Sequence, residues 1–342
     1  MKPPGRLLVL RFSAVGDVVL TSPALEALAT HWPDTHIVVA TLERHAELLQ
    51  HNPHVHQVIP LAPAGGVRSL VRRLRGEGFG AILDLHDSPR SRTLRALLPR
   101  VPTVVWTKRA PGSGPAVKLA LRPFHAEMWL ADRFHGAVEE LVGTSLPRGV
   151  LRTWLGPGLV EQSRARLTDE GVDLATPIVG MAPGAKWSTK RWPVERFGEL
   201  ARSVLATGRQ VVVSGSPDER ALCQELAAQA PGTYLVDADL TLWSGIISLC
   251  EAFVANDSGP MHIARSLQVP TLALFGSTDP RQFDFTGHAA LSAPPPCAPC
   301  HFYGRSFCPR LHFRCMRELH VEPAWVQLSR LLEGDARPTV HG

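Results

Sequence analysis

The sequence predicts an α/β protein made of two domains, each built on a parallel sheet. Two observations lead to this prediction. Short apolar runs alternate with helical patterns along the chain, which is typical of strand–helix–strand units. This alternation starts near residue 7 and again near residue 178, and 342 residues suffice for two domains. Because parallel sheets bind ligands at the carboxyl ends of their strands, we expect the two halves to face each other across a cleft.

In the first half, helices are predicted over Pro23–Trp32 and Glu43–Gln50, and a tight loop over Ser13–Asp17. The apolar runs that predict its strands are Leu7–Leu10, Ile37–Ala40, Val55–Ile59 and Ala81–Leu85. In the second half, one helix begins at Pro193 and another covers Asp218–Ala230. Its predicted strands are Ile178–Met181, Gln210–Ser214, Tyr234–Val236 and Thr271–Phe275. Residues 143–176, rich in Gly and Pro, are expected to connect the domains.

The positive charge of the chain is concentrated in its first half. The net charge is +5, and residues 1–150 contain 18 Lys and Arg against 12 Asp and Glu. Ten of these basic residues lie between Arg68 and Arg109, together with three acidic ones. This stretch favours an anionic partner, such as nucleic acid, an acidic membrane surface or a phosphorylated substrate. The alternative is that these residues only form a solvated, arginine-rich face.

No segment has the pattern of a membrane span or a secretory signal. No apolar run reaches the roughly 18 residues that a span needs. The N-terminal apolar run covers only Leu7–Leu10 before Arg11, which is too short for a signal peptide. We therefore expect a cytoplasmic protein whose six cysteines are mostly reduced.

The stretch FVANDSGPMHIARSLQVPTLALFG, residues 253–276, holds the clearest ligand-binding pattern. An apolar run stops at Asn256, and a helix follows with Ser258 as candidate N-cap and Pro260 in its first turn. Backbone N–H groups and the helix dipole favour a phosphate or diphosphate at such a terminus. His262 lies one turn further on, within reach of the same ligand. An ordinary strand–helix turn with a capping serine is the alternative.

Asp17 is the first candidate for catalysis. It stands in RFSAVGDVVLTSPAL after the first predicted strand, where Gly16 lets the backbone turn tightly. A carboxylate there can act as a general base toward a substrate hydroxyl, or it can cap the following helix. The loop lacks G-x-G-x-x-G and the chain has no G-x-x-x-x-G-K-[ST], which argues against dinucleotide-binding and P-loop proteins.

Two loops of the second half carry charged residues at strand ends. In PGAKWSTKRWPVERF, residues 183–197, the cations of Lys186, Lys190 and Arg191 precede a helix and can neutralise a diphosphate. A solvent-exposed basic loop is the alternative. After the next predicted strand, Glu219 is placed to hold ribose hydroxyls, whereas Asp218 is placed to cap the helix.

Four cysteines near the C-terminus follow the spacing C-x2-C-x7-C-x6-C. They are Cys297, Cys300, Cys308 and Cys315. Thiolates at this spacing can hold a zinc ion tetrahedrally, and reduced packing or a disulfide are the alternatives.

Together these segments resemble glycosyltransferase family 9, the ADP-heptose:lipopolysaccharide heptosyltransferases. The resemblance spans nearly the whole chain and rests on LVLRFSAVGDVVLTSPALEAL, PGAKWSTKRWP and NDSGPMHIARSLQVPTLALFG, in that order, with the tail CAPCHFYGRSFCPRLHFRCM. The K-R-W-P element and the tail look closer to the second heptosyltransferases of the family than to the first.

The family implies a GT-B architecture, in which two Rossmann-like domains with parallel sheets face each other across a central cleft. Residues 1–160 would form the acceptor-binding domain and residues 175–322 the ADP-sugar-binding domain. A C-terminal helix and tail over residues 323–342 would pack back on the first domain.

The resemblance also implies roles for individual residues. Asp17 matches the general base for an inverting attack at the anomeric carbon, Lys190 the lysine that stabilises the departing ADP, and Glu219 the ribose-binding acid. The other implied donor-binding residues are Lys186, Ser188, Thr189, Asp257, Ser258, Gly259 and His262. On the acceptor side stand Ser13 and Gly16, to which we add Arg90, Arg92 and Arg95, although these arginines can instead coat a helix.

The implied reaction moves L-glycero-D-manno-heptose from ADP-heptose to Kdo-lipid A or heptosyl-Kdo-lipid A of the lipopolysaccharide inner core. We expect no cofactor, no catalytic metal and no nucleic-acid partner, and a D-x-D at Asp237–Asp239 that binds no metal. A monomer in peripheral contact with the anionic cytoplasmic face of the inner membrane is expected. The alternatives are a family 9 transferase for an outer-core or protein acceptor, a nucleotide-sugar epimerase, and a zinc-ribbon protein that binds nucleic acid.

Overall fold

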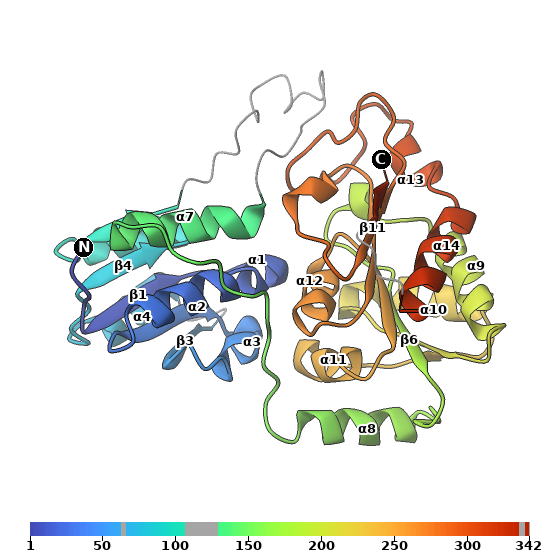
Figure 1. Cartoon of the computed structure of the whole chain (residues 1–342), viewed down its shortest axis with the longest axis horizontal. Helices are drawn as coiled ribbons and strands as arrows, with labels where there is room; N and C mark the ends of the chain where they lie inside the picture. Colours follow the sequence, from blue (N-terminus) through green and yellow to red (C-terminus); the bar gives the residue numbers. More distant parts are fainter. Residues whose placement is uncertain (63–65, 107–128, 335–338, 342) are drawn as a thin grey trace. The chain divides into compact units, whose positions relative to one another are not determined.

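The computed structural model describes residues 1–62, 66–106, 129–334 and 339–341. The described residues form two compact units, one from the chain up to residue 156 and the other from residue 157 onward. Each unit contains one parallel sheet with helices, which confirms the predicted α/β class (Figure 1). Lys108 and Arg109 of the basic stretch, and residues 335–338 and 342 of the C-terminal tail, lie outside the described residues.

The first sheet has five strands in the order β3-β2-β1-β4-β5. All neighbours are parallel, and Leu7 of β1 lies opposite Ile37 of β2 and Ala81 of β4. The strands are β1 (Arg6–Leu10), β2 (His36–Leu42), β3 (Gln57–Leu61), β4 (Ala81–Asp84) and β5 (Thr103–Val105). The helices are α1 (Val15–Val19), α2 (Ser22–His31), α3 (Glu47–Gln50), α4 (Gly66–Leu74), α5 (Pro89–Leu97) and α7 (Leu130–Val142), with a 3-10 turn η1 (Glu43–His45).

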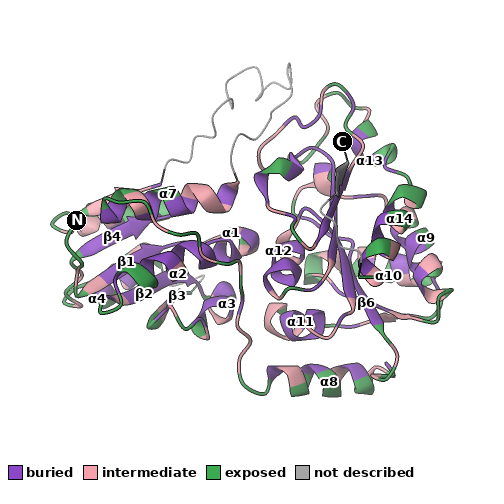
Figure 2. Ribbon diagram, in the orientation of Figure 1, coloured by how far each residue is buried: buried purple, intermediate pink, exposed green. Residues whose placement is uncertain are grey.

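Helices cover both faces of this sheet, which is why its strands are apolar without alternation. Leu8 and Leu10 of β1 belong to a core cluster with residues of α4 and α5. Helices α2 and α7 pack against each other, and α7 also contacts β4 and β5. The strands β1, β2 and β4 are buried almost throughout, as the purple ribbon in Figure 2 shows, whereas the edge strands β3 and β5 are only partly buried.

The second sheet has seven strands in the order β12-β11-β10-β9-β6-β7-β8, again all parallel. They are β6 (Ile178–Ala182), β7 (Gln210–Val213), β8 (Thr233–Leu235), β9 (Ala252–Asn256), β10 (Thr271–Phe275), β11 (Ala289–Ser292) and β12 (Thr339–His341). The helices are α8 (Leu159–Asp169), α9 (Val194–Leu205), α10 (Arg220–Gln229), α11 (Leu240–Ile247), α12 (Gly259–Ser266), α13 (Arg314–Arg317) and α14 (Val321–Leu332). Short 3-10 turns are η2 (Ser188–Lys190), η3 (Pro217–Glu219) and η4 (Pro280–Gln282).

The C-terminal helix α14 packs within the second unit. Ala324, Leu328 and Leu331 are buried in a core cluster with residues of α9, β10 and β11. The structure thus assigns this helix to the second unit, and its expected packing on the first domain stays a prediction. The apolar residues of α14 recur at spacings of three and four, so they form one face of the helix. This face packs against the second sheet.

Two other segments differ from the sequence-based expectations. The predicted loop Ser13–Asp17 is shorter, because α1 already begins at Val15 and includes Asp17 in its first turn. The expected connection over residues 143–176 contains the helix α8, which packs against α11. Gly245 of α11 makes this approach possible, since a Cβ there would lie 2.1 Å from the hydroxyl of Ser163 in α8.

Candidate active site

The predicted site residues gather where the strand order of each sheet reverses. In the first sheet this point lies between β1 and β4, and in the second between β6 and β9. Helices leave such neighbouring strands toward opposite faces, which opens a crevice at their carboxyl ends. Asp17 follows β1, whereas Lys190 and Asp257 follow β6 and β9. Each sheet therefore has its own candidate site.

An ion pair joins the two loops at the crevice of the second sheet. Lys190 Nζ lies 2.6 Å from Asp257 Oδ2, and the side chains are 13% and 4% exposed. Thr278 donates a second hydrogen bond of 2.6 Å to the same oxygen. Burial would raise the pKa of Asp257, but the charges of Lys190 and His262 and the Thr278 bond outweigh it and lower that pKa. Asp257 is thus a carboxylate that fixes the lysine ammonium.

The N-terminus of α12 begins directly after this pair. Ser258 is its N-cap residue, as predicted, but its side chain accepts no capping bond from the helix. The Ser258 hydroxyl oxygen is buried and has no hydrogen-bond partner among the described residues. The first N–H groups of α12 therefore lack the usual side-chain acceptor, a state that an anionic ligand can satisfy.

His262 lies in the second turn of α12 and is buried beside Asp257. It is 5% exposed, its ring packs edge-on against Phe283 at a centroid distance of 4.8 Å, and its charge contributes to the lowered pKa of Asp257. The structure thus brings Asp257, Ser258, Gly259 and His262 together with Lys190, as the sequence predicted for a phosphate site.

Asn256 at the end of β9 holds the loop after β6 in place. Its side-chain amide donates to the carbonyl of Pro183 at 2.7 Å and accepts from the backbone N–H of Trp192 at 3.0 Å. The Trp192 indole in turn donates to the carbonyl of Leu319 at 2.8 Å. Both side chains are buried, so the Lys190 loop is tied at both of its ends.

The remaining predicted donor residues of this loop have different surroundings. Lys186 is exposed, with its ammonium 5.2 Å from the ring centroid of Trp187. The Ser188 hydroxyl donates to the carbonyl of Ser306 at 2.5 Å. Thr189 is 2% exposed, and its hydroxyl bonds to Arg305 and Ser277. Thr189 therefore braces the loop with a hydroxyl that is already bonded within the protein.

Glu219 lies at the same edge of the sheet, after β7. Its carboxylate accepts from the backbone N–H and the hydroxyl of Ser216, at 3.0 and 2.9 Å. It also lies against Gly184 in the loop after β6, where a Cβ would come within 2.1 Å of the Glu219 carboxyl carbon. Asp218 is exposed, and the structure favours Glu219 as the acid that lines this edge.

In the first unit, Asp17 is half-buried in the first turn of α1 and pairs with Arg11. The guanidinium of Arg11 contacts Asp17 Oδ2, and the same oxygen accepts from the Ala14 backbone N–H at 3.2 Å. Ala14 is the N-cap residue of α1, so the bond from its N–H to Asp17 caps this helix. Capping is the role that the sequence offered as the alternative to catalysis. Both contacts occupy Oδ2.

Arg11 is a residue whose role the sequence did not reveal. It is 4% exposed, donates to the carbonyl of Leu85 at 2.5 Å and stacks near the rings of Trp106 and Phe134. A buried arginine at the end of an apolar strand was the available signal, because such a charge requires a partner. Here that partner is Asp17.

Two histidines hold the backbone between Arg11 and Asp17. The Phe12 carbonyl lies 3.0 Å from His45 Nδ1, and the Phe12 N–H donates to His86 Nδ1 at 3.4 Å. His45 is 2% exposed, and burial lowers its pKa, which keeps the ring neutral. These contacts fix the path of the chain into α1.

The predicted acceptor arginines lie on α5 and differ in their contacts. Arg92 makes two bonds to Asp87, at 2.8 and 2.9 Å. Arg95 pairs with buried Asp84 at 3.0 Å and with Asp87 at 3.3 Å. Arg90 is exposed. Arg95 thus anchors α5 to the end of β4, whereas Arg90 and Arg92 are exposed.

The D-x-D segment has a structural role in this chain. Asp237 pairs with Arg220 at 2.6 Å, and Asp239 caps α11 by accepting from the Leu242 N–H at 2.8 Å. The C-terminal cysteines are all free thiols, so the predicted disulfide alternative is not present.

A crevice where the strand order reverses, with a lysine ammonium beside a helix N-terminus, is typical of α/β proteins that bind phosphorylated ligands. The model of glycosyltransferase family 9 (heptosyltransferase) matches residues 67–302. The lipopolysaccharide heptosyltransferase 2 of Salmonella typhimurium is 27% identical, over 82% of this chain and 84% of that protein. The lipopolysaccharide heptosyltransferase 1 of Pseudomonas aeruginosa is 28% identical, over 86% of each chain.

Among solved structures, the chain is similar to the ADP-heptose lipopolysaccharide heptosyltransferase II of Escherichia coli. The TM-score is 0.75 with 21% identity, over 97% of this chain and 100% of the other, which shows the same fold. Because the family model matches more than half of the residues, the chain belongs to glycosyltransferase family 9, the heptosyltransferases. It is a glycosyltransferase with the GT-B fold, as the sequence motifs implied.

The ion pair of Lys190 and Asp257 gives the first testable prediction. Lys190→Met leaves a buried carboxylate without its cation, and we expect the free energy of unfolding at pH 7 to fall by about 3 kcal/mol. Because pairing lowers the Asp257 pKa below its ordinary value of 3.8, this loss should persist at neutral pH and vanish only in acid, as the pH falls through the lowered pKa.

The measurement is urea unfolding followed by tryptophan fluorescence. Lys186→Met, which removes an exposed lysine of the same loop, serves as the matched control and should change stability by less than about 0.5 kcal/mol. Adding Asp257→Asn to the Lys190→Met variant should restore part of the loss. Equal stability of Lys190→Met and the wild-type protein would show that the pair does not stabilise the loop.

Proposed function

We propose that this glycosyltransferase moves L-glycero-D-manno-heptose from ADP-heptose to the lipopolysaccharide inner core, with inversion at the anomeric carbon. One observation carries the proposal: Lys190 is held by Asp257 directly beside the N-terminus of α12. A fixed ammonium next to free backbone N–H groups suits the diphosphate of a nucleotide sugar. Membership of the heptosyltransferase family supports heptose as the sugar.

In this proposal the diphosphate of the donor lies between Lys190 and α12. An ammonium has three donors, of which the Asp257 pair uses one. A phosphate oxygen would also accept from the buried Ser258 hydroxyl and from the Gly259 N–H, and Lys186 would add a mobile charge at the rim. Glu219, which lies against Gly184 at the same edge, would hold the ribose hydroxyls. Ser188 and Thr189 position the loop through their bonds to Arg305 and Ser306.

Asp17 would act as the general base. Both of its contacts within the protein go to Oδ2, so Oδ1 is the atom that takes the proton of the acceptor hydroxyl. The hydroxyl oxygen then forms a bond to the anomeric carbon, and the bond between that carbon and the diphosphate breaks. The electron pair leaves with ADP, whose new negative charge is stabilised by Lys190 and the α12 N-terminus.

Arg11 would keep this base oriented. Its guanidinium is buried between Leu85, Trp106 and Phe134, so the orientation of the pair is set by packing. By holding Oδ2, the arginine would leave Oδ1 of Asp17 to face the acceptor hydroxyl. Arg11 is thus a positioning residue, whereas Asp17 touches the reacting hydroxyl.

The acceptor would be Kdo-lipid A or its heptosylated form, bound by the first unit. Ser13 and Gly16 lie beside Asp17, and Arg90 is exposed on α5. Helix α5 packs against α4, and we propose that the exposed arginines of the two helices form one basic surface. Its exposed members are Arg68, Arg72, Arg73, Arg90 and Arg92. Carboxylates and phosphates of the inner core have the complementary charge.

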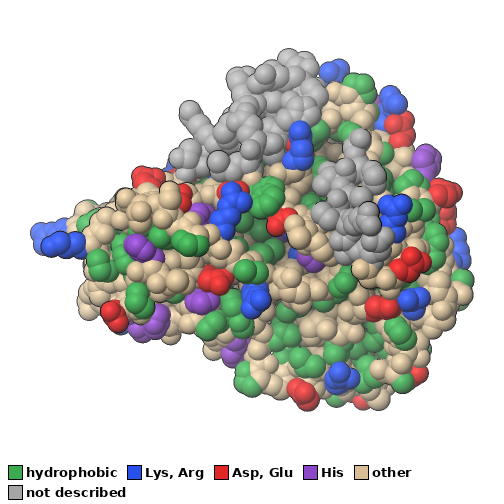
Figure 3. All heavy atoms as spheres, viewed as in Figure 1, with side chains coloured by type: hydrophobic (Ala, Val, Ile, Leu, Met, Phe, Trp, Pro, Cys, Tyr) green, Lys and Arg blue, Asp and Glu red, His purple; other side chains and the backbone are tan. Residues whose placement is uncertain are grey.

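We further propose that the protein acts as a monomer in peripheral contact with the anionic cytoplasmic face of the inner membrane. None of the helices in the described residues is long and apolar enough to cross a membrane. On the described residues of the face in Figure 3, Lys and Arg side chains stand as separate groups among acidic and apolar ones. We propose the surface on α4 and α5 as the membrane contact, because both helices carry exposed arginines.

Transfer activity tests the proposed reaction. With ADP-heptose and either Kdo2-lipid A or its mono-heptosylated form, the wild-type protein should give a product that mass spectrometry detects with one of the two acceptors. Asp17→Asn should keep ADP affinity, measured by calorimetry, and lose at least about 100-fold in turnover, because the amide accepts no proton. The control Asp34→Asn changes an exposed aspartate of the same unit and should keep full turnover.

Near-normal turnover of Asp17→Asn would remove Asp17 as the base. Product from neither acceptor, with ADP binding intact, would instead contradict the inner core as the acceptor and direct the search to an outer-core or protein acceptor. These two outcomes separate the role of the residue from the identity of the acceptor.

Sedimentation with vesicles tests the proposed membrane contact. Wild-type protein should bind vesicles rich in phosphatidylglycerol, and binding should fall as salt is raised from 50 to 500 mM, a range chosen to screen surface charges strongly. The double variant Arg68→Glu, Arg72→Glu should bind at least about tenfold more weakly. The matched control reverses two exposed arginines of the second unit, Arg164 and Arg330. Equal binding of the two double variants would refute this surface as the contact.

A further inference from the structure

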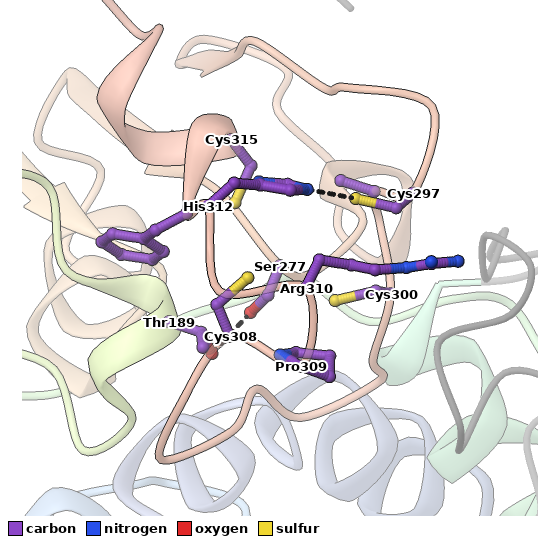
Figure 4. A pocket seen from close by; sticks show the side chains of 11 residues that line it. Thr189, Ser277, Cys297, Cys300, Cys308, Pro309, Arg310, His312 and Cys315 are labelled. Carbon is purple, nitrogen blue, oxygen red and sulfur yellow. Dashed lines mark hydrogen bonds between the residues drawn. The ribbon is translucent and has the colours of Figure 1, made fainter.

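Four cysteines of the C-terminal segment surround one pocket of the second unit. They are Cys297, Cys300, Cys308 and Cys315, and they are the four of the C-x2-C-x7-C-x6-C pattern. Figure 4 shows their side chains around the pocket, with the His312 ring directed at Cys297. His312 Nε2 lies 3.5 Å from Cys297 Sγ. The four cysteines that share this spacing in the sequence therefore also line one pocket in the fold.

The segment that carries these cysteines has little other support. Three of the four lie in residues 293–313, between β11 and α13, a stretch that contains no helix or strand, and Cys315 lies in α13. Long segments without secondary structure need another source of order, such as a cross-link or a bound ion. The six cysteines are free thiols, so no disulfide supplies that cross-link. Cys297 and Cys308 are only half-buried, which also separates them from ordinary core cysteines such as Cys223.

We propose that this pocket binds one thiophilic divalent cation, Zn²⁺ or Fe²⁺, through the four cysteine thiolates. In the described part of the chain, no three Cys, His, Asp or Glu side chains already stand at the spacing of metal ligands, so the segment must contract around the ion. Each thiol that becomes a ligand releases its proton. His312 would donate a hydrogen bond to Cys297 Sγ and thereby support the ligand from outside the coordination sphere.

This site would position Lys190 without touching the substrate. The Arg305 backbone N–H donates to the Thr189 hydroxyl at 2.8 Å, next to Lys190 in the chain. Gly304 has a φ of +93°, and a Cβ there would lie 2.9 Å from Lys190 Cε, so the segment packs directly on the lysine stem. The Cys300 N–H also donates to the Ser277 carbonyl at 2.9 Å. A metal would therefore order the segment that supports the Lys190 loop.

Metal content of the full chain tests the site. The protein is produced in medium supplemented with zinc and iron, purified under reducing, oxygen-free conditions and analysed by mass spectrometry of its elements. We expect about one zinc or iron per chain, with the other metal near zero. Cys308→Ser and Cys315→Ser should lose most of it, whereas the control Cys223→Ser, outside the pocket, should keep it.

Alkylation of the wild-type protein gives an independent readout that needs no variant to fold. Cys297 and Cys308 should resist iodoacetamide until a strong chelator is added, and chelation should also lower the thermal unfolding temperature. Protein without zinc or iron, with both cysteines alkylated at once, would overturn the proposal. Metal that stays bound in both pocket variants would overturn the assignment to these cysteines. Neither result depends on the proposed transferase reaction.

Discussion

The ion pair between Lys190 and Asp257 is the interaction on which the second unit depends. A carboxylate as deeply buried as Asp257 is costly without a cation, and Lys190 supplies one from a loop that follows a different strand. The pair therefore joins the ends of β6 and β9 at the point where the strand order reverses. The start of α12, the Asn256 bonds and the packing of Gly304 are all arranged around this pair.

The first unit repeats this arrangement with the charges exchanged. There the buried group is the cation, Arg11, and the partly exposed group is the carboxylate, Asp17. In both units a buried charge fixes the direction of a more exposed one, which is the one suited to meet a ligand. Such preorganisation lowers the cost of arranging charges during the reaction, and it explains why both pairs lie at carboxyl ends of central strands.

Much of the fold could be predicted from local patterns. The apolar runs that became β1, β6 and β10 lie in sheets covered on both faces, so each strand is apolar throughout and stands out in the sequence. Predicted strands that lie near sheet edges were shifted, as at β3 and β8. Helix α8 was missed because glycine and proline precede it and its buried face, Leu159, Ser163 and Leu167, contains only two apolar residues.

The sequence indicated which residues belong to the candidate site, but it did not indicate which other residues they contact. Asp17, Lys190 and Ser258 stood out because charge or a capping residue followed an apolar run. The partner of Asp17 could not be read, since Arg11 is held by Trp106 and Phe134, which are far away in the chain. For the same reason, nothing local indicated that the Thr189 hydroxyl would bond to Arg305 rather than remain open to a ligand.

The most direct test is a crystal structure of the protein with ADP bound. The account predicts that the diphosphate lies within hydrogen-bonding distance of Lys190 Nζ, the Ser258 hydroxyl and the first N–H groups of α12, with the ribose at Glu219. A diphosphate that binds away from Lys190 and the α12 N-terminus would contradict it.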